Sequence, residues 1–152
     1  MDERLVIGIF ETTIVENVER ILACCDGLDE VGINWKPAAP EMNSIYVLAT
    51  HTMGNVRQNA LAVLGGQEDQ RDRDAEFVAA GNSAVELQQQ WSELKPQVQA
   101  ALSKIGEAEL TREHPHPRRG TVNGLQVLMI AASHAGEHAG QAEMTRDLYR
   151  GQ

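Results

Sequence analysis

The sequence is poor in aromatic residues, which make up 4% of its 152 residues, and it has two cysteines and five prolines. With so few aromatic side chains, the core has to be built mainly from aliphatic side chains and alanine. No segment approaches the roughly 18–20 consecutive apolar residues that a membrane-spanning helix needs. The first residues, MDERLVIGIF, lack a basic leader followed by a long apolar run, so no signal peptide is expected. These absences favour a cytoplasmic protein.

Positive charge is also scarce. The 13 lysines and arginines stand against 22 acidic residues, which gives a formal net charge of −9. Nucleic-acid binding depends on basic side chains that contact phosphates, and attachment to an anionic membrane surface needs basic segments as well. We therefore expect neither nucleic acid nor a membrane as a partner.

The two cysteines, Cys24 and Cys25, are adjacent in the sequence, so they cannot cross-link distant parts of the chain. We interpret both as small buried hydrophobic side chains in a reducing compartment. A redox or nucleophilic role for either thiol is the less favoured alternative.

Apolar residues recur at spacings of three and four in four segments, which predicts four amphipathic helices. These segments are residues 7–25, 44–64, 83–105 and 121–149. The length of the chain suggests a single domain, residues 1–152, with one core. No segment has a convincing strand pattern, so we predict an all-α four-helix bundle.

Local signals set the expected helix ends. Ser44 can cap the second helix, and Ser83-Ala-Val-Glu86 reads as a capping box for the third. Pro96 predicts a kink or a displaced boundary in that third helix.

Two histidines, His134 and His138, lie four residues apart in the segment SHAGEHAGQ of the last predicted helix. Residues at this spacing share one helix face, so both rings can point at one place. Charged rings would repel each other there and neutral rings would leave lone pairs unsatisfied, whereas a divalent cation resolves both problems. His51, in the middle of the second predicted helix, is the candidate third ligand. Three imidazoles with open positions are typical of a catalytic metal site, and they suit zinc, nickel or iron.

Two other interpretations of this pair stay open. A histidine pair at this spacing also arises by chance among core residues. With Glu137, the pair matches the H-x-x-E-H string of inverted zinc proteases. That chemistry needs a further acidic ligand well downstream, and only a short tail follows His138, so we disfavour it.

A second histidine pair, His114 and His116, lies in TREHPHPRRG, which we interpret as an exposed connection between helices. The functional alternative is a basic rim that attracts an anionic substrate. Its arginines would be Arg112, Arg118 and Arg119. The upstream segment RDRDAEF reads as a solvated, charged stretch that anchors Phe77 to the bundle.

The sequence resembles the DinB/YfiT-like superfamily of metalloenzymes. The matching segments are NWKPAAPEMNSIYVLATH, RDRDAEF and HAGEHAGQAEMTRDL, which contain the motifs S-I-x-x-L-x-x-H and H-x-x-x-H-x-G-Q. The resemblance spans nearly the whole chain. It implies a bundle with a long crossover between the second and third helices, usually a homodimer, and a metal triad carried here by His51, His134 and His138.

Within this family, the resemblance implies thiol-dependent S-transferases and an isomerase that use a low-molecular-weight thiol. The expected function is therefore metal-assisted activation of such a thiol for transfer to a small electrophile. A metal-dependent hydrolase, or a non-catalytic stress-related bundle that binds metal or a small ligand, remains an alternative. Candidate substrate-binding residues, chosen by their places on the helices, are Asn55, Gln141 and Asn17, and Glu137 is a weak candidate base.

Overall fold

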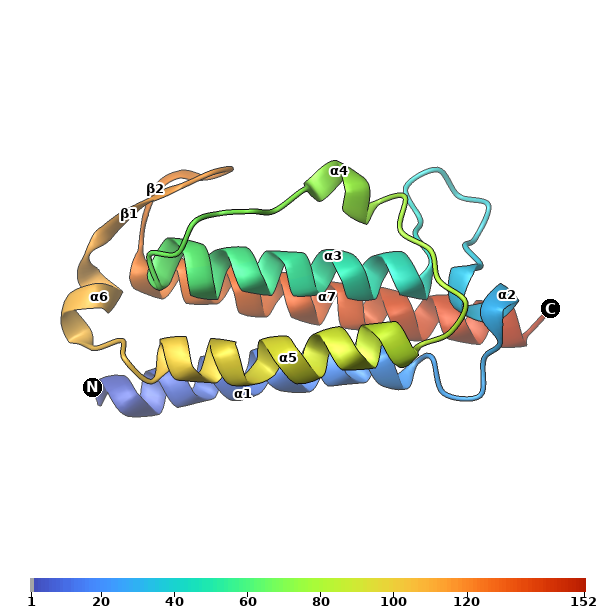
Figure 1. Ribbon diagram of the computed structural model, residues 1–152, viewed down its shortest axis with the longest axis horizontal. Coiled ribbons are helices and arrows are strands. Elements are labelled where there is room, and N and C mark those ends of the chain that lie inside the picture. The colour runs from blue at the N-terminus through green and yellow to red at the C-terminus, as the bar shows by residue number, and fades with distance from the viewer. Residues whose placement is uncertain (1) are drawn as a thin grey trace.

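The computed structural model describes residues 2–152, and four long helices dominate it (Figure 1). They are α1 (Glu3–Ala23), α3 (Ile45–Arg57), α5 (Val85–Leu102) and α7 (Gly124–Arg150). A π-helix, η1 (Gln58–Leu64), continues α3. The four helices pack around one core, which confirms the predicted four-helix bundle.

A long crossover sets the topology of the bundle. It leaves η1, passes along the outside of α3 through the short helix α4 (Arg73–Glu76), and enters α5 at the far end (Figure 1). Because the chain returns before α5 begins, α3 and α5 run in the same direction, while α1 and α7 run in the opposite one. The expected crossover between the second and third long helices is thus present. Two further short helices lie in the other connections, α2 (Glu30–Asn34) and α6 (Glu107–Thr111).

Side chains cap three of the long helices. Ser44 accepts a hydrogen bond from the Val47 amide at 3.1 Å, as expected for the start of α3. Asp2 caps α1 in the same way, through the amide of Arg4. Asn123 forms a reciprocal capping box at the start of α7.

The capping box predicted for α5 does not form, and the helix boundary is not displaced at Pro96. The helix begins at Val85, and its N-cap residue, Ala84, offers no side-chain cap. Ser83 instead accepts from the Val85 amide at 3.3 Å, and Glu86 accepts from the Tyr46 hydroxyl at 3.0 Å, so no capping box forms. The helix also continues through Pro96, which is exposed, so solvent can satisfy the carbonyl that the missing N–H leaves unpaired.

The last helix begins three residues later than predicted, because a small hairpin precedes it. Strands β1 (Glu113–His116) and β2 (Gly120–Asn123) pair antiparallel, with His116 opposite Gly120. Gly120 adopts a positive φ of 70°, which suits glycine at this turn. The buried residues of β1 are His114 and His116, so the alternation of the strand is carried by histidines and not by apolar residues. That is why the sequence shows no strand pattern here.

Aliphatic side chains and alanine fill the core, as the shortage of aromatics predicts. Ile14, Val18 and Ile21 from α1 are almost completely buried. The inner face of α7 is slim because Ala135 and Ala139 are fully buried there, which lets neighbouring helices approach closely. None of the described helices is both long enough and apolar enough to cross a membrane.

Candidate metal centre

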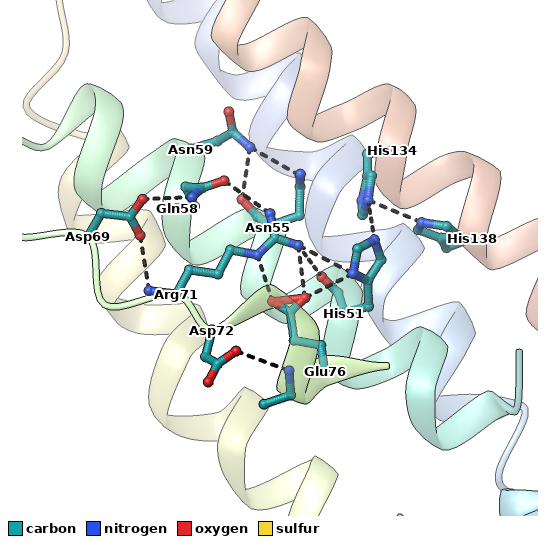
Figure 2. A network of polar contacts seen from close by, with 11 residues as sticks. His51, Asn55, Gln58, Asn59, Asp69, Arg71, Asp72, Glu76, His134 and His138 are labelled. Carbon is teal, nitrogen blue, oxygen red and sulfur yellow. Dashed lines mark hydrogen bonds and ion pairs between the residues drawn. The ribbon is translucent and has the colours of Figure 1, made fainter. Parts of the chain in front are cut away.

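The three predicted ligands converge between α3 and α7. Nε2 of His134 lies 2.9 Å from Nε2 of His51 and 3.1 Å from Nε2 of His138 (Figure 2). His51 is buried, and the other two rings are partly buried. The helical spacing of four residues aims the two α7 rings at one point, and the packing of α3 against α7 delivers the third.

The donor set fits a divalent cation. Imidazole nitrogens in zinc sites lie about 2.0–2.1 Å from the ion, so two of them on one ion lie about 2.9–3.4 Å apart at octahedral or tetrahedral angles. The two separations observed here fall in that range. Three imidazole nitrogens that all lie within 4.8 Å of one another in a partly buried site match the needs of a metal better than those of a hydrogen-bond network. The cluster could hold a metal ion.

The carboxylate of Glu76 orients His51 through Nδ1, the ring nitrogen that does not face the other two histidines. Nδ1 of His51 donates to Oε2 of Glu76, on α4, at 2.9 Å. Arg71 donates to both oxygens of the same carboxylate, at 2.6 and 2.9 Å, and to Oε1 of Gln58 (Figure 2). Burial raises the pKa of Glu76, but the hydrogen bonds from Arg71 and His51 outweigh it and leave this pKa below its ordinary value. The ionised carboxylate only accepts, so it holds the proton of His51 on Nδ1 and leaves Nε2 free to bind a metal.

The two α7 histidines differ in their outer contacts. Nδ1 of His138 donates to Oε1 of Gln141 at 2.7 Å, which leaves its Nε2 free as well. Nδ1 of His134 is buried and has no hydrogen-bond partner among the described residues. Burial, followed by the charges of His138 and His51, lowers the pKa of His134 to about 2. The His134 ring is therefore neutral at physiological pH, as a metal ligand has to be.

A cavity of ≈ 380 Å³ lies beside the histidines. Its size is within the range of pockets that hold small molecules. His51 and His134 form part of its wall, and so do the predicted site residues Asn55 and Glu137. The other residues of the wall are Gln58, Arg71, Arg73, His116, Arg118, Arg119, Met129, Ile130 and Ser133.

Three other predicted site residues, His138, Gln141 and Asn17, do not line this cavity. Gln141 contacts His138, so its place suits an orienting residue. Asn17 lies on α1, where it donates to the carbonyl of Thr13 at 2.8 Å and accepts from Arg20 at 2.6 Å. The structure therefore places Asn17 away from the cavity.

Sequence reasoning missed the contribution of the two connections. The segment expected to be solvated contains Arg71 and Glu76, whose side chains are only 5% and 8% exposed. Phe77 does anchor this segment, since its ring lies 4.6 Å from that of His51. The expected exposed loop is the hairpin that buries His114 and His116, so that interpretation was wrong. The sequence feature that could have pointed to these buried contacts was the high content of arginine, histidine and acidic residues in both segments.

The fold and the histidines together define a helix-bundle protein with a three-histidine cluster beside a small-molecule cavity. Residues 13–142 match the DinB superfamily, and the chain belongs to this superfamily. A solved structure described as the conserved protein of locus from Enterococcus faecalis superposes with a TM-score of 0.77, at 20% identity, over 95% of this chain and 97% of that one. At this identity, the likeness concerns the fold alone. No protein of curated function matches the chain in sequence.

Proposed function

We propose that this protein is a metal-dependent enzyme that activates a low-molecular-weight thiol for S-transfer to a small electrophile. The observation that carries the proposal is the convergence of three imidazole Nε2 atoms, two of them from residues that line a cavity, His51 and His134. His51, His134 and His138 would hold a divalent ion, such as zinc, nickel or iron. When bound, such an ion lowers the pKa of a thiol or water in its open positions.

A thiol nucleophile has to come from outside the chain. The only cysteines, Cys24 and Cys25, lie in the core and do not line the cavity. Burial raises the pKa of both thiols, that of Cys25 to about 12. A thiol with a raised pKa is a poor nucleophile at neutral pH. This supports an exogenous thiol or water as the attacking group.

The residues around the histidines have separable tasks in this proposal. Glu76 and Gln141 fix the rings of His51 and His138 through their Nδ1 protons. Glu137 is exposed, lines the cavity and can accept the proton that the incoming thiol releases. Asn55, one turn from His51 and also on the wall, can hydrogen-bond a substrate.

Metal analysis tests the first half of the proposal. Untagged protein purified without added metal or chelator is expected to contain nearly one metal ion per chain. His51→Ala and His134→Ala are expected to lose most of it while keeping their helical content, because alanine favours helix. His114→Gln, which changes a buried histidine outside the cluster, is the matched control. Full occupancy in either alanine variant would remove that histidine from the ligand set.

Turnover tests the second half. The metal-loaded protein is expected to accelerate the reaction of a small thiol with a chloro-substituted aromatic electrophile. The sulfur forms the new bond to carbon, chloride leaves with the bonding electrons, and the thiol proton passes to Glu137 or solvent. Hydrolysis of simple esters without thiol would instead favour the hydrolase, in which water is activated. A metal-loaded protein with neither activity would favour the non-catalytic alternative.

We also propose that the protein is a homodimer, as its superfamily resemblance implies. Leu5 and Ile9, which lie one turn apart on α1, are exposed apolar residues. Burying such residues against a second copy would remove them from water. Light scattering on the eluting protein should give twice the mass of the chain, and Ile9→Lys should give the monomer mass. A monomer at micromolar concentration would rule the dimer out.

A further inference from the structure

We infer that the cavity beside the three histidines binds the oxyanion group, a carboxylate or a phosphate, of its small-molecule substrate through Arg73, Arg118 and Arg119. This inference rests on the proposed function for the role of the ligand as a substrate. The binding of the anion itself rests only on residues of this chain.

Positive charge is concentrated in this cavity, although the chain as a whole is acidic. Four arginines form part of its wall, whereas the single carboxylate among its lining residues is that of Glu137. The protein as a whole carries a net charge of −9. The arginines come from two separate connections: Arg71 and Arg73 from the crossover, and Arg118 and Arg119 from the hairpin turn. A wall in which positive charges outnumber the single negative one attracts small anions.

Three of the four guanidinium groups are available to a ligand. Arg71 is engaged by Glu76 and Gln58 and serves as part of the wall. Arg118 and Arg119 make no side-chain hydrogen bond or ion pair within residues 2–152, and both are exposed. Arg73 lies over the ring of Phe77, at 4.7 Å from its centroid, and has no carboxylate partner among the same residues. Guanidinium groups match the geometry of carboxylate and phosphate oxygens.

A buried histidine holds the two hairpin arginines at the cavity. His116 is 7% exposed, and its Nε2 donates to Oδ1 of Asn59, in η1, at 3.1 Å. Its Nδ1 accepts from the backbone amide of Arg118 at 3.1 Å, and its carbonyl accepts from the amide of Arg119. The turn that carries both arginines is therefore fixed to the bundle, so their backbones are pre-organised although their side chains reach solvent.

The arginines lie in the same cavity as two histidines of the candidate metal site. His51 and His134 belong to the same wall as the arginines, and Ser133 and Asn55 add polar groups. An oxyanion bound by Arg118 and Arg119 would leave the remainder of the same molecule within the cavity that the histidines line. The arginines would thus select an anionic substrate and orient its uncharged part toward the metal site.

Calorimetric titration of metal-free protein with succinate and with inorganic phosphate at low ionic strength tests this inference. Binding of either anion is expected, with at least about tenfold weaker affinity in the double variant Arg118→Gln/Arg119→Gln. Arg112→Gln, on the same connection but outside the cavity wall, is the matched control and is expected to bind like the wild type. Succinate without phosphate would assign a carboxylate, and the reverse would assign a phosphate. An absence of binding, or equal affinity in the double variant, would overturn the inference.

Metal content separates this inference from the proposed function. The double variant is expected to keep the metal of the wild type, because neither side chain that is changed makes a hydrogen bond or ion pair with His51, His134 or His138. His51→Ala is expected to lose metal and still bind the anion. A wild-type protein that binds metal but neither anion would count against the arginine site alone, whereas a protein that binds anions but never metal would count against the proposed enzyme alone.

Discussion

Glu76 accepts a hydrogen bond from Nδ1 of His51 at 2.9 Å, although the two residues lie 25 positions apart and on different elements. The side chains of both are less than a tenth exposed. The same carboxylate pairs with Arg71, so one buried acid links the crossover to a metal-ligand candidate on α3. This contact makes the crossover part of the site and not merely a connection between helices.

Replacing this carboxylate should weaken metal binding without unfolding the protein. In Glu76→Gln, the amide keeps the size of the side chain, but the charge that fixes the His51 tautomer is lost. We expect metal affinity to fall about ten- to a hundredfold, measured by competition with a chromophoric chelator. Asp74→Asn changes an exposed acid on the same short helix and should leave the affinity unaltered. Equal affinity in Glu76→Gln would show that Glu76 serves only to neutralise Arg71.

A glycine on α3 makes room for Glu76. A Cβ atom at Gly54 would collide with the Glu76 carboxylate. Alanine normally stabilises a helix interior by about 1 kcal/mol relative to glycine, but Gly54→Ala should be destabilising and should also lower metal affinity. Gly8→Ala, on α1, where a Cβ meets nothing within 4 Å, is the control and should be stabilising. Urea denaturation of both variants measures the difference. A stability gain in Gly54→Ala would contradict this account of the glycine.

The long helices and the place of the histidines follow from the sequence because helical periodicity is local. A spacing of four residues puts His134 and His138 on one face whatever surrounds them, and Leu48 and Asn55 mark the face of His51. The bundle then brings the three rings together, as the structure shows. The start of α3 could be predicted for the same reason, since the Ser44 cap contacts only its own helix.

The partners of those histidines could not be predicted, because they depend on contacts between segments without periodicity. In the sequence, Glu76 and Arg71 have the pattern of solvated charges. In the structure, the crossover buries both side chains against α3. The hairpin could not be predicted because the inward-facing residues of β1 are His114 and His116, which give no alternation of apolar and polar residues. Asn17 was placed by its helix face alone, and the structure turns it toward Arg20.

Acid should destabilise the metal-free protein through His134. Its pKa is lowered from 6.5 to about 2 by burial and then by the neighbouring histidines. The unfolded chain therefore binds a proton below pH 6.5 that the folded chain does not, so stability is complete above that pH and is lost as the pH falls toward 2. This group alone should remove about 1.4 kcal/mol between pH 7.5 and pH 5.5. Urea denaturation with chelator present measures the loss, which should be smaller by that amount in His134→Ala. Parallel losses in both proteins would show that His134 is protonated in the folded state.

The two cysteines should resist alkylation while the protein is folded. Cys24 and Cys25 are 0% and 3% exposed, and burial raises the pKa of both thiols. At pH 7.5 we expect iodoacetamide to label the folded protein at least about a hundredfold more slowly than the same chain in guanidinium chloride, because both access and thiolate are lacking. Mass spectrometry follows the labelling, with free glutathione as the reference thiol. Labelling of the folded protein as fast as glutathione would reveal a reactive cysteine and would reopen the question of whether the nucleophile belongs to the chain itself.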